Sequence, residues 1–186
     1  MSADNTALLV MDMQNSIVSR FVQQEQQLEP FQQAIAVARE HGIQVIYIHV
    51  GFRDGYPEVH PSNKMFGGVA ARGGNTDPEQ IKIHDAVAPQ EGEAVVMKKR
   101  FSAFTGSDLE VILRSNRIEH LVLSGIATSG VVLSTLREAS DKDYVLTVLS
   151  DACIDADPEV HRVLTEKVFP VQAEVITVNE WAKSLH

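Results

Sequence analysis

Six short apolar runs, separated by segments with helical periodicity, are the feature that most constrains the fold of this chain. Each run is apolar at consecutive positions, and most runs are rich in β-branched residues. That pattern is typical of strands buried on both faces of a parallel sheet, because every side chain then meets a covering layer. We therefore predict strands over residues 7–11, 45–48, 94–97, 121–123, 144–149 and 175–178.

Helical patterns lie between most of these runs. Residues 29–41 place apolar side chains at helical spacing, with Pro30 in the first turn and Gly42 directly after the segment. Proline suits the first turn of a helix, and glycine suits its end. Similar patterns predict helices over 79–87, 108–114 and 131–141, and one that begins at Asp157.

Strands that alternate with helices predict an α/β fold with a mainly parallel sheet. The apolar runs give this sheet six strands, and the helices between them would flank it in a Rossmann-like, three-layer arrangement. No repeat or linker divides the chain. We therefore expect a single domain over residues 1–186.

One long segment, residues 51–92, interrupts the alternation. It is dense in glycine and proline, and only its part after Glu79 has a helical pattern. Long irregular connections within a compact domain are more often functional than idle. We expect this segment to cover a pocket.

The charge balance of the chain argues against two classes of partner. Its 186 residues include 16 Lys and Arg and 25 Asp and Glu, which leaves a formal net charge of −9. An acidic surface repels nucleic-acid phosphates and anionic membranes, so neither is an expected partner. The chain has one cysteine, no apolar run near the roughly 20 residues that span a bilayer, and no signal-peptide pattern at its start. We expect a cytoplasmic protein with a small-molecule substrate.

Polar residues follow the predicted strands, at the edge where parallel sheets bind their ligands. Asp12 follows the first strand, Lys98 follows the third, and the glycine-bounded turn 124–130 follows the fourth. Burial at a strand end raises the pKa of an aspartate and favours proton transfer, whereas a nearby lysine lowers that pKa. Taken alone, Asp12 is also compatible with a helix cap, and Lys98 with a buried stem that carries a solvated ammonium group.

Four motifs in a fixed order connect these segments to a known family. They are VMDMQN at residues 10–15, KKRFSAFTGSDL at 98–109, LVLSGIATSGVVLSTLREA at 121–139 and VLSDACID at 148–155. Over nearly its whole length the chain resembles the isochorismatase-like hydrolases, a superfamily of cysteine hydrolases that also contains nicotinamidases and N-carbamoylsarcosine amidases. The resemblance implies a six-stranded parallel sheet flanked by helices, assembly as a homodimer or homotetramer, and catalytic roles for Asp12 and Lys98.

The chain departs from the thiol members of this family at the nucleophile. The resemblance places their catalytic cysteine four residues after Ala127, and this chain has Val131 there. Valine has no lone pair and no acidic proton, so it cannot form a thioester. The single cysteine, Cys153, is expected to be a small buried hydrophobe. Ser129 and Ser134 do not stand at the matching position.

The resemblance also implies a role for the turn around Ala127. In the family the peptide bond before this alanine is cis, and the backbone N–H groups of Ala127 and Val131 would form an oxyanion hole. Substrate-binding roles are expected for Gln14 and Gly130, and for a lid that includes Phe52, Phe101 and Phe104.

Three functions follow from these observations. The first is hydrolysis of a small anionic substrate by acid–base chemistry of Asp12 and Lys98, with vinyl-ether hydrolysis favoured because true isochorismatases also lack the thiol. The second is a catalytically inactive family member that acts as a binding or scaffold protein. The third is an amidase or nicotinamidase-type enzyme with a displaced nucleophile. No cofactor is expected, and no metal, because His49, Asp54 and His60 do not match the family's metal-binding spacing.

Overall fold

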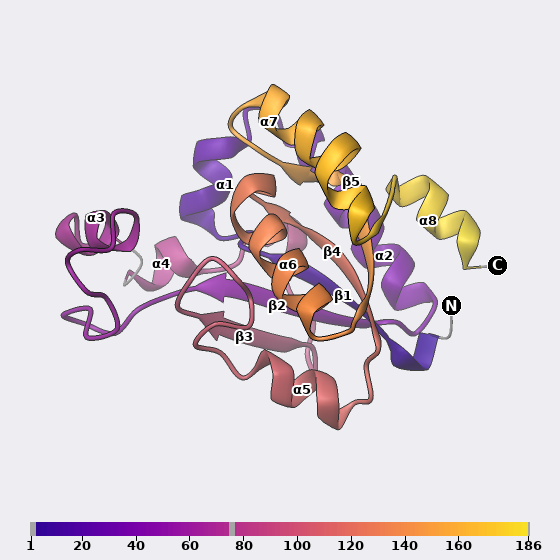
Figure 1. Cartoon of the computed structure of the whole chain (residues 1–186), viewed down its shortest axis with the longest axis horizontal. Helices are drawn as coiled ribbons and strands as arrows, with labels where there is room; N and C mark the ends of the chain where they lie inside the picture. Colours follow the sequence, from indigo (N-terminus) through magenta and orange to yellow (C-terminus); the bar gives the residue numbers. More distant parts are fainter. Residues whose placement is uncertain (1–2, 75–76, 186) are drawn as a thin grey trace.

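The computed structural model describes residues 3–74 and 77–185, which form one sheet with helices on both faces (Figure 1). The strands are β1 (Thr6–Met11), β2 (Gln44–Val50), β3 (Ala94–Lys98), β4 (His120–Ile126), β5 (Val145–Ile154) and β6 (Glu174–Ile176). Within the described residues they make a six-stranded sheet in the order β3-β2-β1-β4-β5-β6, and each neighbouring pair is parallel. The predicted α/β fold with a parallel sheet is confirmed.

Strand β1 shows why consecutive apolar residues form a central strand. All of its residues are buried, and it pairs with β2 on one side and with β4 on the other. Leu9 packs into the core on one face of the sheet, whereas Leu8 and Val10 pack into the core on the other. Because helices cover both faces, the run over residues 7–11 is apolar at every position.

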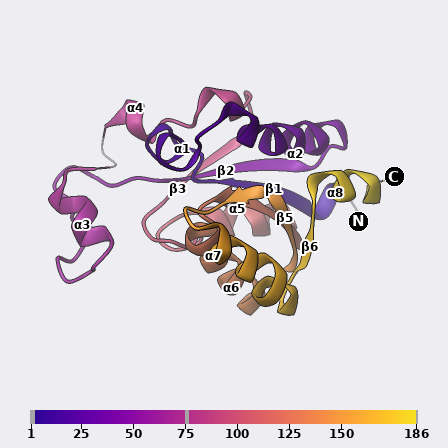
Figure 2. The ribbon, with the colours of Figure 1, turned by 90° about the horizontal axis from the view of Figure 1, so that it is seen from above.

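Two layers of helices cover the sheet (Figure 2). Helices α1 (Asn15–Phe21), α2 (Glu29–Glu40) and α8 (Val178–Ser184) place side chains such as Phe31 and Trp181 in the core on one face. Helices α5 (Leu109–Ser115), α6 (Leu133–Asp141) and α7 (Pro158–Val163) lie on the opposite face. Short 3-10 or π-helical turns occupy Ala3–Asn5, Glu25–Leu28, Asp85–Val87, Thr128–Val132, Leu164–Val168 and Phe169–Val171.

The long segment between β2 and β3 contains two further short helices. They are α3 (Phe66–Ala71) and α4 (Pro78–Ile81), and α3 projects away from the sheet in both views (Figure 1; Figure 2). No helix in the described part of the chain is long and apolar enough to cross a membrane.

The prediction of one helix over residues 79–87 is wrong, because α4 ends at Ile81 and extended backbone follows it. Ile83 pairs with Gln14 in an antiparallel bridge. The His84 N–H donates to the carbonyl oxygen of Met13 at 2.8 Å. The backbone after Ile81 therefore satisfies its hydrogen bonds at the end of β1 instead of continuing the helix.

Strand β5 is longer than the apolar run 144–149 that predicted it. The pairing of β4 with β5 shifts in register between Leu123 and Gly125 of β4. Beyond this shift, Gly125 pairs with Cys153 of β5. The polar residues after position 149 therefore belong to the strand rather than to a loop beyond it. Helices α1, α3 and α8 were not predicted.

Candidate active site

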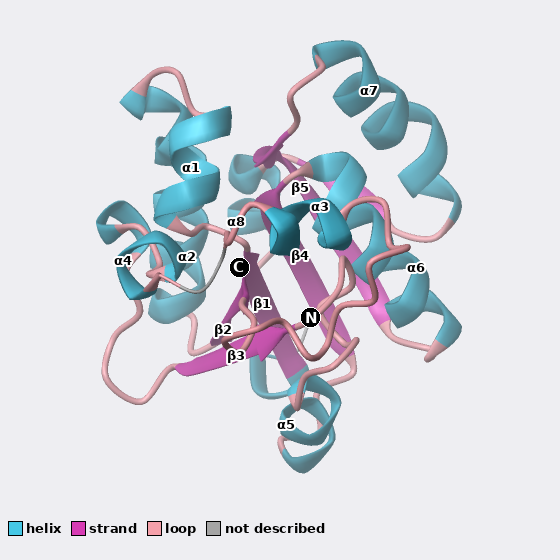
Figure 3. Cartoon of the chain, turned by 90° about the vertical axis from the view of Figure 1, so that its left-hand side faces the viewer, coloured by secondary structure: helices cyan, strands magenta, loops and turns pink. Residues whose placement is uncertain are grey.

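The candidate site lies at the carboxyl ends of the central strands, where β1 separates β2 from β4. After β1 the chain enters α1 on one face of the sheet, and after β4 it enters α6 on the other. This divergence opens a crevice, which is the usual ligand-binding position in open α/β sheets. Figure 3 views the molecule from the side on which α1, α3 and α4 lie.

Asp12 and Lys98 meet in this crevice. The Lys98 ammonium nitrogen lies 2.9 Å from Asp12 Oδ2, and the two side chains are only 2% and 8% exposed, respectively. The ammonium group also donates to the carbonyl oxygens of Arg100 at 2.8 Å and Phe101 at 3.1 Å. The expected contact between the two residues is therefore present, and three acceptors hold the ammonium group in place.

The position of Asp12 is set by the backbone beyond β1. Its N–H donates to the carbonyl oxygen of Ile48 at 2.8 Å, and its φ of 58° lies in the left-handed region. That conformation is uncommon for a residue with a side chain, and aspartate is one of the types that adopt it most readily. The turn directs the chain from the buried strand into α1.

Burial raises the pKa of Asp12 above its ordinary value, and the charge and hydrogen bond of Lys98 offset part of that increase. Carboxylate Oδ1 of Asp12 is buried and has no hydrogen-bond partner among the described residues. Buried polar atoms are almost always paired, so an unpaired carboxylate oxygen in a crevice marks a group held for chemistry or for a ligand.

A cavity of about 320 Å³ opens above this pair. Its apolar wall includes Ile17, Val50, Phe66, Val69, Phe101 and Val131. Its polar wall includes Asp12, Ser16, Arg20, Arg72, Gln80 and Lys98. An apolar pocket with a few convergent polar groups is the general form of a small-molecule site.

The turn after β4 forms another part of the wall. The peptide bond between Ile126 and Ala127 is cis, as the family resemblance implied. Ala127, Gly130 and Val131 line the cavity. Val131, which stands where the family resemblance implies the cysteine of the thiol enzymes, presents an aliphatic side chain to the cavity.

Side chains from the β5–α7 region hold this turn. The Ser129 N–H donates to Asp155 Oδ2 at 2.7 Å. The Thr128 hydroxyl lies 2.8 Å from His161 Nδ1, and burial lowers the pKa of that histidine. The backbone of the turn is thus fixed by contacts outside the cavity.

Gln14 does not line the cavity. Its side chain is fully buried, and its amide donates to the Val50 carbonyl oxygen at 2.9 Å and accepts from the Val50 N–H at 2.8 Å. Both polar ends of the amide are therefore occupied by backbone. Gln14 ties the end of β1 to the end of β2, and neither end of its amide is left over for the substrate contact expected of it.

The aromatic lid also differs from the expected one. Phe104 is buried in the core, 6.1 Å from the Tyr144 ring, and does not line the cavity. Phe101 does line it, and its ring lies 5.2 Å from that of Phe66. Phe52 packs behind Phe66, at 5.8 Å between ring centroids. The aromatic wall is therefore formed by Phe101, Phe66 and Phe21.

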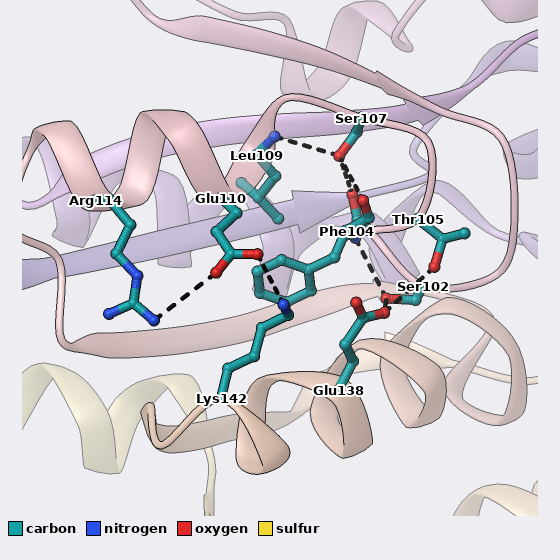
Figure 4. A network of polar contacts seen from close by, with 10 residues as sticks. Ser102, Phe104, Thr105, Ser107, Leu109, Glu110, Arg114, Glu138 and Lys142 are labelled. Carbon is teal, nitrogen blue, oxygen red and sulfur yellow. Dashed lines mark hydrogen bonds and ion pairs between the residues drawn. The ribbon is translucent and has the colours of Figure 1, made fainter.

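The loop after β3 places Phe101 at the cavity and Phe104 in the core. This loop is anchored to α6 (Figure 4). The Ser102 hydroxyl donates to Glu138 Oε2 at 2.5 Å, and the Ala103 N–H donates to Thr135 Oγ1 at 3.0 Å. These bonds hold the loop so that Phe101 faces the cavity while Ala103 and Phe104 pack in the core.

Neither the cysteine nor the serines considered above line the cavity. Cys153 is buried outside the cavity lining, and burial raises its pKa to about 12. A thiol with so high a pKa is almost entirely protonated at neutral pH, and the thiolate is the nucleophilic form. Ser129 and Ser134 do not line the cavity either.

Several cavity residues were not predicted. Phe66, Val69 and Arg72 come from the irregular segment 51–92, which was expected to cover a pocket but offered no pattern to select side chains. Ser16 and Arg20 come from α1. Their spacing of four residues would place them on one helix face, which is a signal that the sequence contains.

Comparisons with known proteins agree with this fold. The isochorismatase domain family matches residues 6–180. The ureidoacrylate amidohydrolase RutB of Stutzerimonas stutzeri is 35% identical over an alignment of 186 residues, gaps included. This alignment covers 86% of this chain and 73% of the relative. RutB of Acinetobacter baylyi is 32% identical, and the alignment covers 87% of this chain and 76% of the relative.

Solved structures show the same architecture. A cysteine hydrolase from Pseudomonas syringae pv. phaseolicola superposes with a TM-score of 0.90 at 22% identity, covering 100% of this chain and 94% of that chain. An isochorismatase family protein from Burkholderia thailandensis superposes with a TM-score of 0.81 at 30% identity, covering 98% of this chain and 96% of that chain. The N-carbamoylsarcosine amidase from Thermoplasma acidophilum superposes with a TM-score of 0.76 at 25% identity, covering 94% of this chain and 97% of that chain.

The parallel sheet and the crevice at its carboxyl edge define an α/β protein with a small-molecule site, and the curated relatives are named as hydrolases. The chain belongs to the isochorismatase family of hydrolases.

Proposed function

We propose that this hydrolase cleaves a small anionic substrate by acid–base chemistry of Asp12, without a covalent thiol intermediate, and that a carboxyvinyl ether is the substrate type. The observation that carries the proposal is the buried Asp12–Lys98 pair, 2.9 Å apart, in a cavity that contains Val131 in place of a nucleophile. A reaction that needs only a proton donor and water suits such a site.

Asp12 acts first as the acid. Burial raises its pKa, which increases the fraction of the carboxylic acid form near neutral pH. The acid donates its proton to the terminal methylene carbon of the vinyl ether, and the ether carbon becomes an oxocarbenium ion. The Lys98 ammonium, 2.9 Å away, stabilises the Asp12 carboxylate that remains.

Water then completes the reaction. A water molecule adds to the oxocarbenium carbon and returns a proton to Asp12, which regenerates the acid. The resulting hemiketal collapses to an alcohol and pyruvate, so that one water is consumed for each ether bond broken. The apolar wall formed by Phe66, Phe101 and Val131 limits access of bulk water to the ion.

Amide hydrolysis is the second candidate, and it is favoured by the relatives named for it. The RutB relatives are ureidoacrylate amidohydrolases, and one structural neighbour is an N-carbamoylsarcosine amidase. In this alternative the Asp12 carboxylate would take a proton from the water that attacks the carbonyl carbon. Asp12 would then give that proton to the nitrogen as the C–N bond breaks and the amine leaves. The backbone of Ala127 and Val131, which line the cavity, would stabilise the oxyanion.

A substrate panel separates these functions. Carboxyvinyl ethers, N-carbamoyl amino acids, simple amides and esters are assayed with the wild-type protein, with Asp12→Asn and with the exposed control Asp141→Asn. We expect turnover of a carboxyvinyl ether that falls by about 10²–10⁴-fold in Asp12→Asn and is unchanged in the control. Turnover of N-carbamoyl substrates alone would favour the amidase. No turnover of any class would favour a binding protein.

A further inference from the structure

Three consecutive cations, Lys98, Lys99 and Arg100, stand at the end of β3. The chemistry proposed above uses the first of them and leaves the other two without a role. The Lys99 ammonium donates to the carbonyl oxygen of Gly51 at 2.7 Å and lies 3.8 Å from Glu58 Oε1. Lys99 thus ties the loop after β3 to the irregular segment that follows β2.

The Arg100 side chain makes a second and more specific connection to that segment. Its guanidinium group donates to the carbonyl oxygens of Glu58 at 2.7 Å and Lys99 at 2.6 Å, and it lies over the Phe66 ring, 5.6 Å from the centroid. Within residues 3–74 and 77–185 this guanidinium forms no ion pair with a carboxylate. A planar, forked cation can bond two carbonyls and stack on a ring together, whereas a lysine ammonium cannot reproduce that geometry.

Phe66 is the residue that this connection places at the cavity. Its side chain is buried, lines the cavity and lies 5.2 Å from the Phe101 ring. Phe66 also begins α3, which projects away from the sheet (Figure 1). Because the rest of α3 leaves the body of the protein, contacts with the loop after β3 determine where Phe66 stands.

The backbone of Arg100 contacts the other side of the site. Its carbonyl oxygen accepts a hydrogen bond from the Lys98 ammonium at 2.8 Å, and that ammonium lies 2.9 Å from Asp12 Oδ2. One residue therefore holds the aromatic wall through its side chain and the Asp12–Lys98 pair through its carbonyl oxygen. Arg100 thus fixes the position of the wall relative to the pair.

We propose that Arg100 is a positioning residue that keeps water away from the Asp12–Lys98 pair by holding Phe66 in the aromatic wall. Displacement of Phe66 opens the cavity at this wall and hydrates the pair. The inference rests on the proposed function in taking Asp12 and Lys98 to be the reacting groups. It does not depend on which bond they cleave.

Two substitutions at Arg100 separate its geometry from its charge. Arg100→Gln removes the fork and the cation, and Arg100→Lys removes the fork but keeps the cation. Both retain the carbonyl oxygen that accepts from Lys98. Arg114→Gln is the matched control, because Arg114 is exposed, lies 5.1 Å from the Tyr144 ring centroid and is outside the cavity lining.

Two measurements that need no turnover are made on the full chain. Hydrogen exchange followed by mass spectrometry reports the opening of residues 51–74. Carbon-13 NMR titration of the aspartate carboxyl groups reports the protonation of Asp12, whose signal is identified by its loss in Asp12→Asn. Lys98, Arg20 and Arg72 are the other charged groups that line the cavity in the described part of the chain, and all three are retained in the variants.

The direction of the Asp12 titration discriminates between the possible causes. Burial is the larger reason that the pKa of Asp12 is raised, so entry of water should lower that pKa toward its ordinary value. Loss of a nearby cation alone would raise it instead. We expect the pKa of Asp12 to fall in both Arg100→Gln and Arg100→Lys, and exchange in residues 51–74 to quicken by about tenfold or more in Arg100→Gln. Arg114→Gln should change neither.

A pKa of Asp12 that stays unchanged or rises in Arg100→Gln would overturn the proposal, even if exchange in residues 51–74 quickens, because Arg100 would then have a structural role only. So would an Arg100→Lys protein that titrates like the wild type, since charge without the fork would then suffice. If Arg100→Gln does not fold, Arg100→Lys carries the test, and failure of both to fold would also overturn the proposal. A wild-type protein without hydrolase activity that shows the expected titration changes would refute the proposed reaction and leave the role of Arg100 standing.

Discussion

The Ser102 hydroxyl donates a 2.5 Å hydrogen bond to the Glu138 carboxylate, which joins the loop after β3 to helix α6 (Figure 4). Phe101, the residue before Ser102, supplies one of the carbonyl oxygens that hold the Lys98 ammonium. Thr105 donates to the same carboxylate at 3.3 Å. Glu138 therefore stabilises the loop that positions Lys98, although it does not itself line the cavity.

Removing this carboxylate should destabilise the protein. Glu138→Ala leaves the Ser102 hydroxyl, in a residue only 7% exposed, without its acceptor. We expect the free energy of unfolding, measured by urea denaturation, to fall by about 1–3 kcal/mol. The double variant Ser102→Ala/Glu138→Ala should lose less than the sum of the two single losses, because both remove the same bond. Strictly additive losses would show that the two side chains are not coupled.

Stability should depend on pH through Asp12. Burial raises the folded-state pKa of Asp12, so the folded protein binds this proton more tightly than the unfolded chain does. The contribution of Asp12 to the free energy of unfolding is therefore greatest below the unfolded pKa of about 4 and falls as the pH rises through the folded pKa.

Lys98→Met should make that fall larger. The substitution keeps the buried stem but removes the ammonium that offsets part of the pKa increase, so the folded pKa of Asp12 rises further. Urea denaturation between about pH 4 and pH 8 measures the difference, with the exposed Lys167→Met as the control. A pH profile in Lys98→Met that runs parallel to the wild-type profile would contradict this account of the pair.

Cys153 should be unreactive in the folded protein. It is buried, and its pKa is raised to about 12, so little thiolate is present at neutral pH. We expect no labelling by iodoacetamide in native buffer and complete labelling in urea, as read by mass spectrometry. Loss of hydrolase activity that tracks modification of Cys153 would instead favour a displaced nucleophile.

Val131→Cys should create a reactive thiol. Val131 lines the same cavity as Lys98 and lies at the start of the helical segment that leads into α6, and positive charge and a helix N-terminus both lower a thiol pKa. The lost methyl group should cost about 1 kcal/mol. In a Cys153→Ala background, the new thiol should react with iodoacetamide faster than the same thiol in urea. Slower labelling in the folded state would show that the cavity does not activate a nucleophile at this position.

Gly125→Ala should destabilise the junction of β1 and β4. An added Cβ would lie 2.5 Å from the Met11 carbonyl oxygen and 2.8 Å from Met11 Cβ, so the two strands would have to move apart. We expect a loss of about 1–3 kcal/mol or more in thermal or urea denaturation. Gly130→Ala is the matched control, because its Cβ would meet the Phe101 ring at an ordinary 3.6 Å. Equal stability of the two variants would argue against the close approach at Gly125.

Local sequence determined the sheet and the meeting of Asp12 with Lys98. Consecutive apolar residues predict strands buried on both faces, and parallel strands bring their carboxyl ends to one edge. Residues at the carboxyl ends of β1 and β3 are therefore expected at the same crevice, where the structure places Asp12 and Lys98 2.9 Å apart. The valine at position 131 was also evident from the sequence, since it depends only on a count along a motif.

Tertiary contacts decided which side chains line the cavity. Phe101 and Phe104 belong to one loop, and no periodic pattern distinguishes the cavity residue from the core residue, because the path of the loop is set by the bonds from Ser102 and Ala103 to α6. The helix expected after Glu79 ends at Ile81, because backbone bonds to the end of β1 replace its next turn. Arg72 reaches the cavity from the end of the short helix α3, in a segment whose sequence has no clear period, for the same physical reason. The position of such a segment depends on contacts with residues distant in the chain, and these leave no local signature.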